Sequence, residues 1–351
     1  MFGFLKGRRK EGPASDPQQV PDAAPAAAGH PGLEPFVYAD HMDFNEGLPH
    51  VRWPDVHEWI APLDEAGRNA AWEACNLGWL LHLRDALGEG YHVTRSPAAL
   101  VMSSMPPADL KSVHGLVGLI AQRIPKVLVG IVEPPDDGRE VLVVFDDQDT
   151  YYRYASMFDP EGGEYAFSSG RYIGGWASYF MTTRDDPHAV EPVIAHEMTH
   201  AFLSHLPLPL WLNEGLAVNT EARLSRPMGR QFTPQEMHAK HQRFWGPDEM
   251  QQLWSGTSFR RPDEGNMLSY DLARILVDKM SADWERFAAF ALEADWSDGG
   301  AAAALKHYGI GLGQVASVLL EREPDPSFEP DPARWEQPAE RAPERTAASI
   351  G

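Results

Sequence analysis

Apolar residues recur at helical spacing in the middle of the chain, between about Asp186 and Ser204. The residues that carry this pattern follow an i, i+4, i+8, i+11 spacing: Val190, Ile194, Met198 and Ala201. The spacing predicts a helix with one buried stripe. Pro207 and Pro209 cannot continue that helix, so the chain must turn after it. We expect a second helix over about residues 211–224.

The part of the chain before this pair alternates between helical and extended patterns. A helix is predicted from Asp64 to Leu87, with Asp64 as its N-cap and Gly88 as its end. Another begins near Pro106, and its apolar residues are Val113, Leu116, Val117 and Ile120. Short apolar runs between turn residues predict strands at Tyr91–Thr94, Ala99–Ser103, Val127–Val132, Val141–Phe145 and Tyr172–Thr183. A short helix is expected at Thr150–Met157.

Composition divides the chain into four parts. Residues 1–35 are rich in Pro, Ala, Gly and Gln without periodicity and predict a disordered leader; residues 322–351 predict a disordered tail. Between them we expect an N-terminal α+β lobe over residues 36–185, whose first stretch, to residue 62, wraps the domain irregularly. Residues 186–321 would contain the two central helices and a helical C-terminal lobe. The predicted fold class is α+β with a small mixed sheet.

Charge and cysteine content limit the classes of function. The 351 residues include 51 acidic and 30 basic side chains, and this excess of acid opposes nucleic-acid binding, because phosphate recognition requires a basic surface. The longest apolar runs fall far short of the ~20 residues of a membrane span. Cys75, the single cysteine, excludes an intrachain disulfide, and its helical surroundings predict a small buried side chain. At the N-terminus, the basic residues from Lys6 onward follow the apolar ones, the reverse of a secretory signal. We therefore expect a cytoplasmic protein without a membrane partner.

The central helix carries a His-Glu-x-x-His motif over His196–His200. Residues four apart lie on one face of a helix, so both imidazoles can reach one metal ion, and Glu197 leans toward that side. A catalytic zinc takes three protein ligands and leaves its fourth position for water. Glu214 opens the second helix and is the natural third ligand. We therefore predict one Zn²⁺ ion held by His196, His200 and Glu214.

His205 is a rival for the third ligand position. The three-histidine pattern of the metzincins needs glycine at position 203 and histidine at position 206, and this chain has Leu203 and Leu206 there. Five residues of helix turn through about 500°, which places His205 roughly 140° away from the ligand face. We expect His205 to be a capping or surface residue, and Glu214 to be the ligand.

The sequence HEMTHAFL followed by WLNEGLAVNTE resembles the gluzincin branch of the zinc metallopeptidases, the peptidase MA-like group. Trp-Leu-Asn-Glu-Gly is also similar to the third-ligand segment of zinc aminopeptidases. The resemblance extends over about residues 90–285 and implies a zincin-like fold with an active-site helix beside a helical C-terminal lobe. It implies that His196, His200 and Glu214 bind zinc and that Glu197 is the catalytic base.

The chain departs from the aminopeptidases at two points. Only 13 residues separate His200 from Glu214, a shorter gap than in those proteins. The strand expected at residues 172–183 lacks a Gly-x-Met-Glu-Asn motif, which in aminopeptidases holds the free amine of the substrate. We therefore favour an endopeptidase. The glycines at 174 and 175 would permit either close approach of a peptide paired with this strand or only a bulge.

Four further residues have predicted roles near the metal. Similar families place a tyrosine on a helix after the third ligand, so Tyr270 is the candidate donor to the oxyanion; a core aromatic is the alternative, and His241 and Tyr179 are other candidates. Glu221 lies seven residues past Glu214, nearly on the same helix face. It would accept a hydrogen bond from a ligating histidine or remain a solvated side chain.

The function predicted from these residues is zinc-dependent hydrolysis of a peptide or protein substrate, with Glu197 as general base. Two alternatives stay open. One alternative is a non-catalytic interaction module that retains a metal. The other is a metallohydrolase that acts on a non-peptide amide or ester. The presence of Glu197 opposes the first, because a structural zinc has no need of a base and takes a fourth protein ligand. Asn213, beside the third ligand, is expected to face the substrate backbone.

Overall fold

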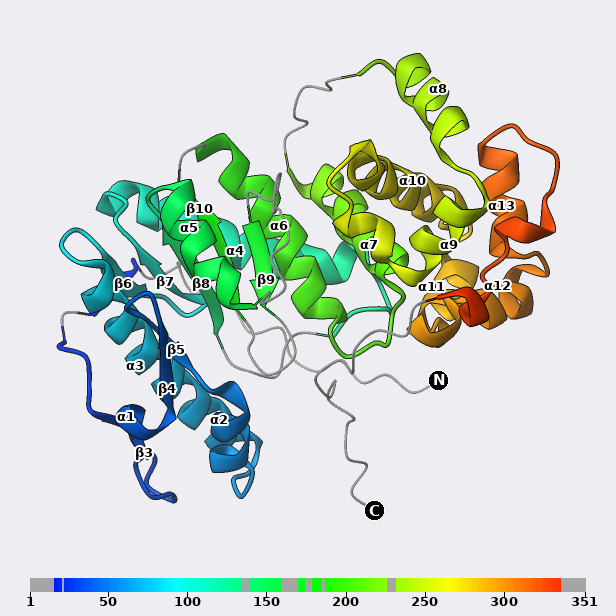
Figure 1. The fold of residues 1–351 in the computed structure, drawn as a ribbon. Helices are drawn as coiled ribbons and strands as arrows, with labels where there is room; N and C mark the ends of the chain where they lie inside the picture. The colour runs from blue at the N-terminus through cyan, green and yellow to red at the C-terminus, as the bar shows by residue number, and fades with distance from the viewer. Residues whose placement is uncertain are drawn as a thin grey trace, which may run out of the picture.

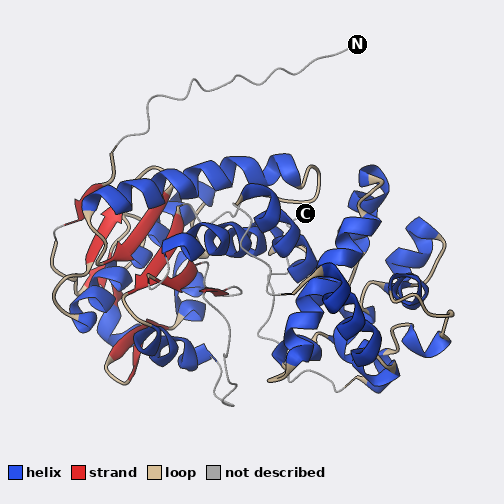
Figure 2. Ribbon diagram, turned by 90° about the horizontal axis from the view of Figure 1, so that it is seen from above, coloured by secondary structure: helices blue, strands red, loops and turns tan. Residues whose placement is uncertain are grey.

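The computed structural model describes residues 16–20, 22–133, 139–158, 170–173, 179–184, 187–225 and 232–335. In these ranges the protein is mixed and predominantly helical with small sheets, in agreement with the predicted α+β class. Figure 1 shows the largest sheet at one end of the molecule, a lobe of helices at the other, and the helix α6 (Pro187–Leu203) between them. Seen from above, the strands again gather at one end (Figure 2).

The largest sheet within the described residues has six strands in the order β1-β6-β7-β8-β10-β9. Their bounds are β1 Gln18–Val20, β6 His92–Arg95, β7 Ala99–Ser103, β8 Glu140–Phe145, β9 Gly170–Ile173 and β10 Tyr179–Thr183. β7, β8 and β10 run parallel, and the pairs β1–β6, β6–β7 and β10–β9 are antiparallel. The sheet is therefore mixed, and β1 and β9 are its edge strands.

The helices that precede α6 include two long ones. Their bounds are α1 Tyr38–His41, α2 Trp53–Ile60, α3 Glu65–Leu87, α4 Pro107–Val127 and α5 Gln148–Ala155. The predicted cap of α3 is confirmed, because the Asp64 side chain accepts a hydrogen bond from the Gly67 amide at 2.8 Å. Gly88 follows α3 with a φ of +95°, as its predicted role as the helix end requires. Cys75 is buried inside α3, which was also predicted.

Both faces of the sheet are buried under helices. Along β8, Leu142 and Val144 belong to a core shared with α4 and α6, whereas Val141 and Val143 belong to a second core shared with α3 and α5. A strand covered on both faces is apolar throughout, which explains why β8 reads Val-Leu-Val-Val-Phe without alternation. The first core continues past α6 into the C-terminal helices, so α6 is packed between the sheet and the helical lobe.

Two predicted strands differ from the observed elements. The strand predicted at residues 127–132 is wrong, because α4 runs to Val127 and the chain then turns through Leu128 and Ile131, which are buried in the first core. That apolar run therefore reflects burial at a helix end. The single strand predicted at residues 172–183 is also wrong, since β9 and β10 form an antiparallel pair there. The glycines at 174 and 175 lie outside the described residues.

The prediction of a disordered leader up to residue 35 is wrong for its described part, from residue 16 onward. β1 pairs with β6 at the sheet edge, and β2 (Ala27–Ala28) pairs with β3 (Phe36–Val37). The stretch 36–62, which was predicted to be irregular, contains the hairpin of β4 (Met42–Asn45) and β5 (Leu48–Val51), followed by α2. Backbone hydrogen bonds hold these segments, to a distant strand for β1 and to nearby strands for β2 and β4, and composition does not report such bonds.

The predicted disordered tail is also wrong for its described part, residues 322–335. Two short 3-10 helices lie there, η4 (Pro326–Phe328) and η5 (Pro332–Arg334). Phe328 is 3% exposed and joins the first core. Gln251 donates to the carbonyls of Ser327 and Glu329, so a buried side chain from another helix fixes the backbone of this segment.

The C-terminal lobe is helical, as predicted. Its helices are α7 Leu210–Leu224, α8 Pro234–Phe244, α9 Pro247–Ser255, α10 Glu264–Met280, α11 Trp284–Glu293, α12 Ala301–Tyr308 and α13 Leu312–Leu319. α7 lies beside α6 and also packs along α10, so it links α6 to the rest of the lobe. Among the described helices, none is both long enough and apolar enough to cross a membrane.

Candidate metal centre

The two central helices pack against each other and are joined by a short proline-containing turn. α6 ends at Leu203 and α7 begins at Leu210, with Pro209 as its N-cap residue. The buried stripe of α6 is seen at Ile194, Met198 and Ala201, which are at most 2% exposed. The remaining member of the predicted stripe, Val190, lies on a stretch of α6 whose side chains are outside the description. With this stripe buried, His196 and His200 face α7.

The structure brings together the three side chains predicted to bind zinc. The Nε2 atoms of His196 and His200 lie 3.2 and 3.5 Å from Oε2 of Glu214, and the three ligand atoms are all within 4.8 Å of one another. Ligands at about 2.0–2.1 Å from a tetrahedral zinc are separated from each other by roughly 3.3 Å. The two distances to Glu214 therefore match the spacing of ligands around a tetrahedral ion. Among the described residues, this is the one group of three such side chains placed to hold a metal.

Each histidine is oriented by a contact at its other ring nitrogen. Nδ1 of His196 lies 3.1 Å from Oε2 of Glu221, and Nδ1 of His200 lies 2.7 Å from Oδ1 of Asn213. A proton on each Nδ1, donated to these oxygens, leaves the Nε2 lone pairs directed at the metal position. Glu221 thus occupies the place predicted for it. The Oδ1 atom of Asn213, a residue that was expected to face the substrate backbone, instead contacts the second histidine.

Carboxylates dominate the charge of the site. Burial raises the pKa of the Glu214 carboxyl, but His200 and His196 outweigh this effect and hold that pKa well below its usual range. Burial lowers the pKa of His196, yet its hydrogen bonds to Glu214 and Glu221 raise that pKa well above its usual value. The side chains of His196, His200 and Glu214 are only 12–15% exposed. Such a largely buried, electron-rich cluster favours a cation at its centre.

Glu197 lies beside the triad but is not part of it. Its side chain is buried, with the residue 7% exposed, and its charge acts on both imidazoles by raising their pKa values. A carboxylate at the edge of a three-ligand site is placed to act on a molecule at the open position rather than to fill that position. This is the arrangement that the His-Glu-x-x-His spacing predicts.

Tyr270 is positioned on α10, which packs along α7. Its ring contacts Phe259 edge-on, with centroids 5.0 Å apart, and packs against the first core. Burial raises the pKa of the Tyr270 hydroxyl well above its usual value, and the charges of Glu214 and Glu197 raise it further. The ring of Tyr270 is therefore a core aromatic, one of the two alternatives that the sequence left open. Its hydroxyl lies within reach of the charges of the two site carboxylates, and its role as donor to the oxyanion stays a prediction.

Close contact of the two helices places Tyr270 in this position. A Cβ on Gly215 would lie 2.6 Å from the carbonyl oxygen of Ala273 and 2.7 Å from Cγ2 of Val277. Tyr270, Ala273 and Val277 share one face of α10 because they are three and four residues apart. The glycine after the third ligand thus lets α10 approach α7 until their backbones touch, one turn away from Tyr270.

The structure excludes the other candidate donors and the rival ligand. Both ring nitrogens of His241 are occupied, one by Asp271 and one by the indole of Trp245. Tyr179 belongs to the second core, on the opposite face of the sheet from α6. His205 is exposed beyond the end of α6 and is absent from the metal group.

Comparisons with protein-family models, with curated proteins and with solved structures found no match to this chain. The assignment of this centre therefore depends on its own geometry. One residue that sequence reasoning placed wrongly, Asn213, had a local signal. It precedes Glu214 in the first turn of α7, so a helix that directs Glu214 at the metal also brings Asn213 near the same histidine pair.

Proposed function

We propose that this protein is a zinc-dependent hydrolase of the gluzincin type, with a zincin-like fold, that cleaves peptide bonds. The observation that carries the proposal is the position of Glu214 Oε2, 3.2 and 3.5 Å from the two imidazole Nε2 atoms, with Glu197 beside the triad and outside it. Three ligands with one nearby carboxylate is the composition of a catalytic site, whereas a structural zinc is closed by a fourth protein ligand.

The ligand set favours zinc over other common ions. Two imidazoles and one carboxylate match the donors of catalytic zinc sites, whereas calcium and magnesium prefer oxygen ligands throughout. When bound, zinc supplies a water ligand with a pKa near ~7 and polarises the carbonyl of the substrate. The hydrogen bonds from His196 to Glu221 and from His200 to Asn213 preset both imidazoles for this ion.

Glu197 and Tyr270 would carry out the proton transfer and charge stabilisation. Glu197 accepts the proton of the attacking water and then delivers it to the leaving amine, which suits a buried carboxylate that does not ligate the metal. The Tyr270 hydroxyl keeps its proton because its pKa is raised, so it remains a hydrogen-bond donor at neutral pH. A neutral donor aimed at the site would stabilise the negative charge that develops on the substrate oxygen.

A peptide is favoured as the substrate by the position of β9. Within the part of the chain that the structure describes, this strand is the last in the sheet order, and it packs beside α6, the helix that bears the motif. The free edge of an antiparallel strand offers backbone donors and acceptors to an extended peptide, which would pair with it as one more strand. A small amide or ester has no extended backbone that could pair with such an edge.

The decisive experiment is a peptide-library digestion by zinc-loaded protein, with the Glu197→Gln variant as its control. We expect internal cleavage by the wild type, and a loss of turnover of about 10³-fold or more in the variant, which should still bind zinc. Metal analysis should find one zinc per chain in both proteins and a loss of zinc in His196→Ala. Full zinc in His196→Ala would refute the metal assignment.

Other outcomes separate the rival functions. Cleavage of small amides or esters without cleavage of any peptide would assign the same machinery to a different substrate. Stoichiometric zinc with no hydrolysis of either class would make the chain a metal-bearing interaction module, and the proposed activity would be wrong. Equal turnover by wild type and Glu197→Gln would remove Glu197 as the base.

A further inference from the structure

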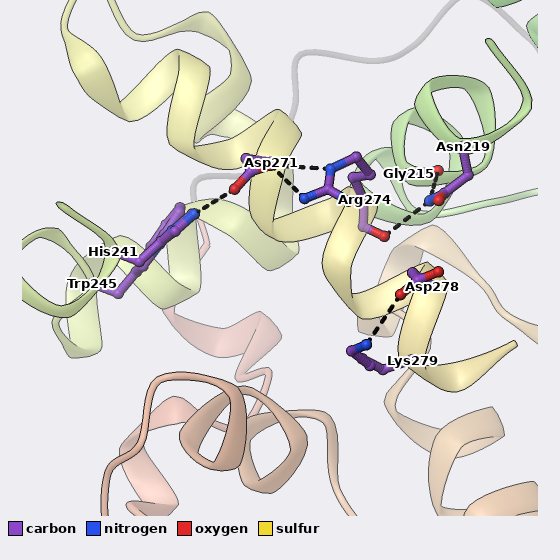
Figure 3. A network of polar contacts seen from close by, with 8 residues as sticks. All are labelled: Gly215, Asn219, His241, Trp245, Asp271, Arg274, Asp278 and Lys279. Carbon is purple, nitrogen blue, oxygen red and sulfur yellow. Dashed lines mark hydrogen bonds and ion pairs between the residues drawn. The ribbon is translucent and has the colours of Figure 1, made fainter. Parts of the chain in front are cut away.

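The helix that carries Tyr270 is held on one side by a hydrogen bond with α8. Oδ2 of Asp271 lies 3.0 Å from Nε2 of His241, and Oδ1 of Asp271 accepts hydrogen bonds from Arg274 at 2.8 and 3.0 Å (Figure 3). Burial raises the pKa of the Asp271 carboxyl, but the hydrogen bonds from His241 and Arg274 outweigh this and keep that pKa below its usual value. Asp271 is therefore an anion with both oxygens engaged.

His241 is confined to one tautomer and one role. The indole Nε1 of Trp245 donates to its Nδ1 at 2.8 Å, so the ring proton is on Nε2 and is donated to Asp271. The His241 side chain is only 4% exposed. Burying a polar pair at a helix contact is less stabilising than burying two apolar side chains of similar size. A buried hydrogen-bonded pair instead fixes the orientation of the two helices relative to each other.

The opposite side of α10 is held by α7. The Asn219 side chain donates to the carbonyl of Arg274 at 2.9 Å and to the carbonyl of Gly215 at 2.8 Å (Figure 3). Gly215 is also the residue whose missing side chain admits Ala273. α10 is thus fixed between α7, which supplies the third metal ligand, and α8, which supplies His241.

Rotation of α10 about its own axis is the motion to which Tyr270 is most sensitive. A tyrosine hydroxyl lies up to about 9 Å from the axis of its helix, so a rotation of roughly 10° moves it by about 1.5 Å. A misplacement of about 1 Å is enough to lower a rate by roughly 100-fold. Asp271 is the next residue after Tyr270, and its bond to His241 opposes this rotation directly.

We propose that His241 and Asp271 are positioning residues that set the rotation of α10 and thereby aim the Tyr270 hydroxyl at the metal centre. The inference rests on the proposed hydrolase function. It assigns no contact with substrate to His241, because both of its ring nitrogens are engaged within the protein. Its effect on the rate passes through Tyr270 alone.

The kinetic test is a double-mutant cycle between His241→Phe and Tyr270→Phe in zinc-loaded protein. Because the donor would be misplaced, we expect His241→Phe to lower kcat by about 10- to 100-fold with KM within about twofold and one zinc retained. In the Tyr270→Phe background the same change should have no further effect on kcat. His241→Gln, which keeps a donor for Asp271, should recover part of the rate. Independent, multiplicative losses would overturn the inference, as would a Tyr270→Phe variant with the kcat of the wild type.

A matched control is available on the same helix. Asp278 forms an exposed ion pair with Lys279 at 3.2 Å, away from His241 (Figure 3). Asp278→Asn should leave kcat unchanged, whereas Asp271→Asn should lower it, although both changes remove one carboxylate charge from α10. If His241→Phe does not fold, Asp271→Asn replaces it in the double-mutant cycle with Tyr270→Phe. Equal effects of the two Asn variants would overturn the inference.

A second measurement does not require activity. Protein labelled with 3-fluorotyrosine has 10 tyrosine resonances, and the one absent from Tyr270→Phe identifies Tyr270. In metal-free protein we expect His241→Phe to shift this fluorine resonance and Asp278→Asn to leave it unchanged. An unmoved resonance in His241→Phe would overturn the inference even if the enzyme cleaves peptides. A shifted resonance in a protein that cleaves nothing would retain the structural coupling and refute the proposed function.

Discussion

Replacement of Gly215 by alanine tests whether close packing of α7 on α10 determines the metal site. The added Cβ would lie 2.6 Å from the carbonyl oxygen of Ala273, against an ordinary contact of about 3.4 Å. The two backbones would have to separate by about 0.8 Å. Overpacking of this kind costs about 1–3 kcal/mol, and alanine recovers roughly 1 kcal/mol of helix propensity. We expect a net destabilisation of up to about 2 kcal/mol.

The metal site should respond more strongly than the fold. Glu214 is the residue before Gly215, and a catalytic constellation tolerates displacement of only about 0.5 Å. We therefore expect zinc affinity to fall by about tenfold or more, in the range found when supporting contacts of a metal site are lost. Urea unfolding of metal-free protein gives the change in stability, and competition with a chromophoric chelator gives the affinity.

Gly115 provides the matched control, because it lies on the exposed face of α4 and a Cβ added there would have no atom within 4 Å. Gly115→Ala should stabilise the protein by about 0.5–1 kcal/mol through helix propensity and leave zinc binding unchanged. The two variants are thus the same substitution with opposite expected signs. If Gly215→Ala were as stable as Gly115→Ala and bound zinc like the wild type, the backbone contact would not determine the site.

Three other predictions follow from contacts elsewhere in the chain. Glu221→Gln removes the charged acceptor of His196 Nδ1 and should weaken zinc binding by about 10- to 100-fold in the chelator assay; unchanged affinity would contradict its role. Burial lowers the pKa of His114 from 6.5 to about 4, so below pH 6.5 the unfolded chain binds its proton first and stability falls as the pH drops toward 4. The stability difference between wild type and His114→Gln should change by about 3 kcal/mol between pH 7 and pH 4, measured by urea unfolding; a constant difference would refute this. Gln251→Ala removes four hydrogen bonds that hold residues 327–335 and should cost about 2–3 kcal/mol and expose this segment to proteolysis, whereas unchanged cleavage would show that other contacts suffice.

Much of the fold could be read from the sequence wherever the deciding interactions are local. The cap at Asp64, the periodicity of α6 and the prolines after it each act within a few residues, so these elements appear as predicted. The strand predicted at residues 127–132 failed for a physical reason. A short apolar run has the same composition at a buried helix end as in a buried strand, and its neighbours in space decide between the two.

The candidate site, too, was predictable from the sequence only where the deciding geometry is local. The spacing of His196 and His200 places both on one helix face, and the proline turn returns the chain so that Glu214 can approach them. The sequence does not show which oxygen orients each imidazole, because this depends on the rotation of α7 relative to α6. Glu221 was predicted from helix geometry, whereas Asn213 was assigned to substrate and instead holds His200.

By itself, the sequence determined the helix that presents the motif, the turn after it and the identity of three side chains able to bind a metal, since each follows from periodicity and bond geometry within a short segment. Only the tertiary structure decided which of the candidate side chains lies near the carboxylates of that centre. Tyr179 is one residue from Phe180, and the alternation of β10 sends them to opposite faces of the sheet. Both ring nitrogens of His241 are hydrogen-bonded within the protein, one to Asp271 and one to Trp245. Tyr270 lies near the carboxylates because Gly215 lets two helices meet, a contact between residues more than fifty positions apart in the chain.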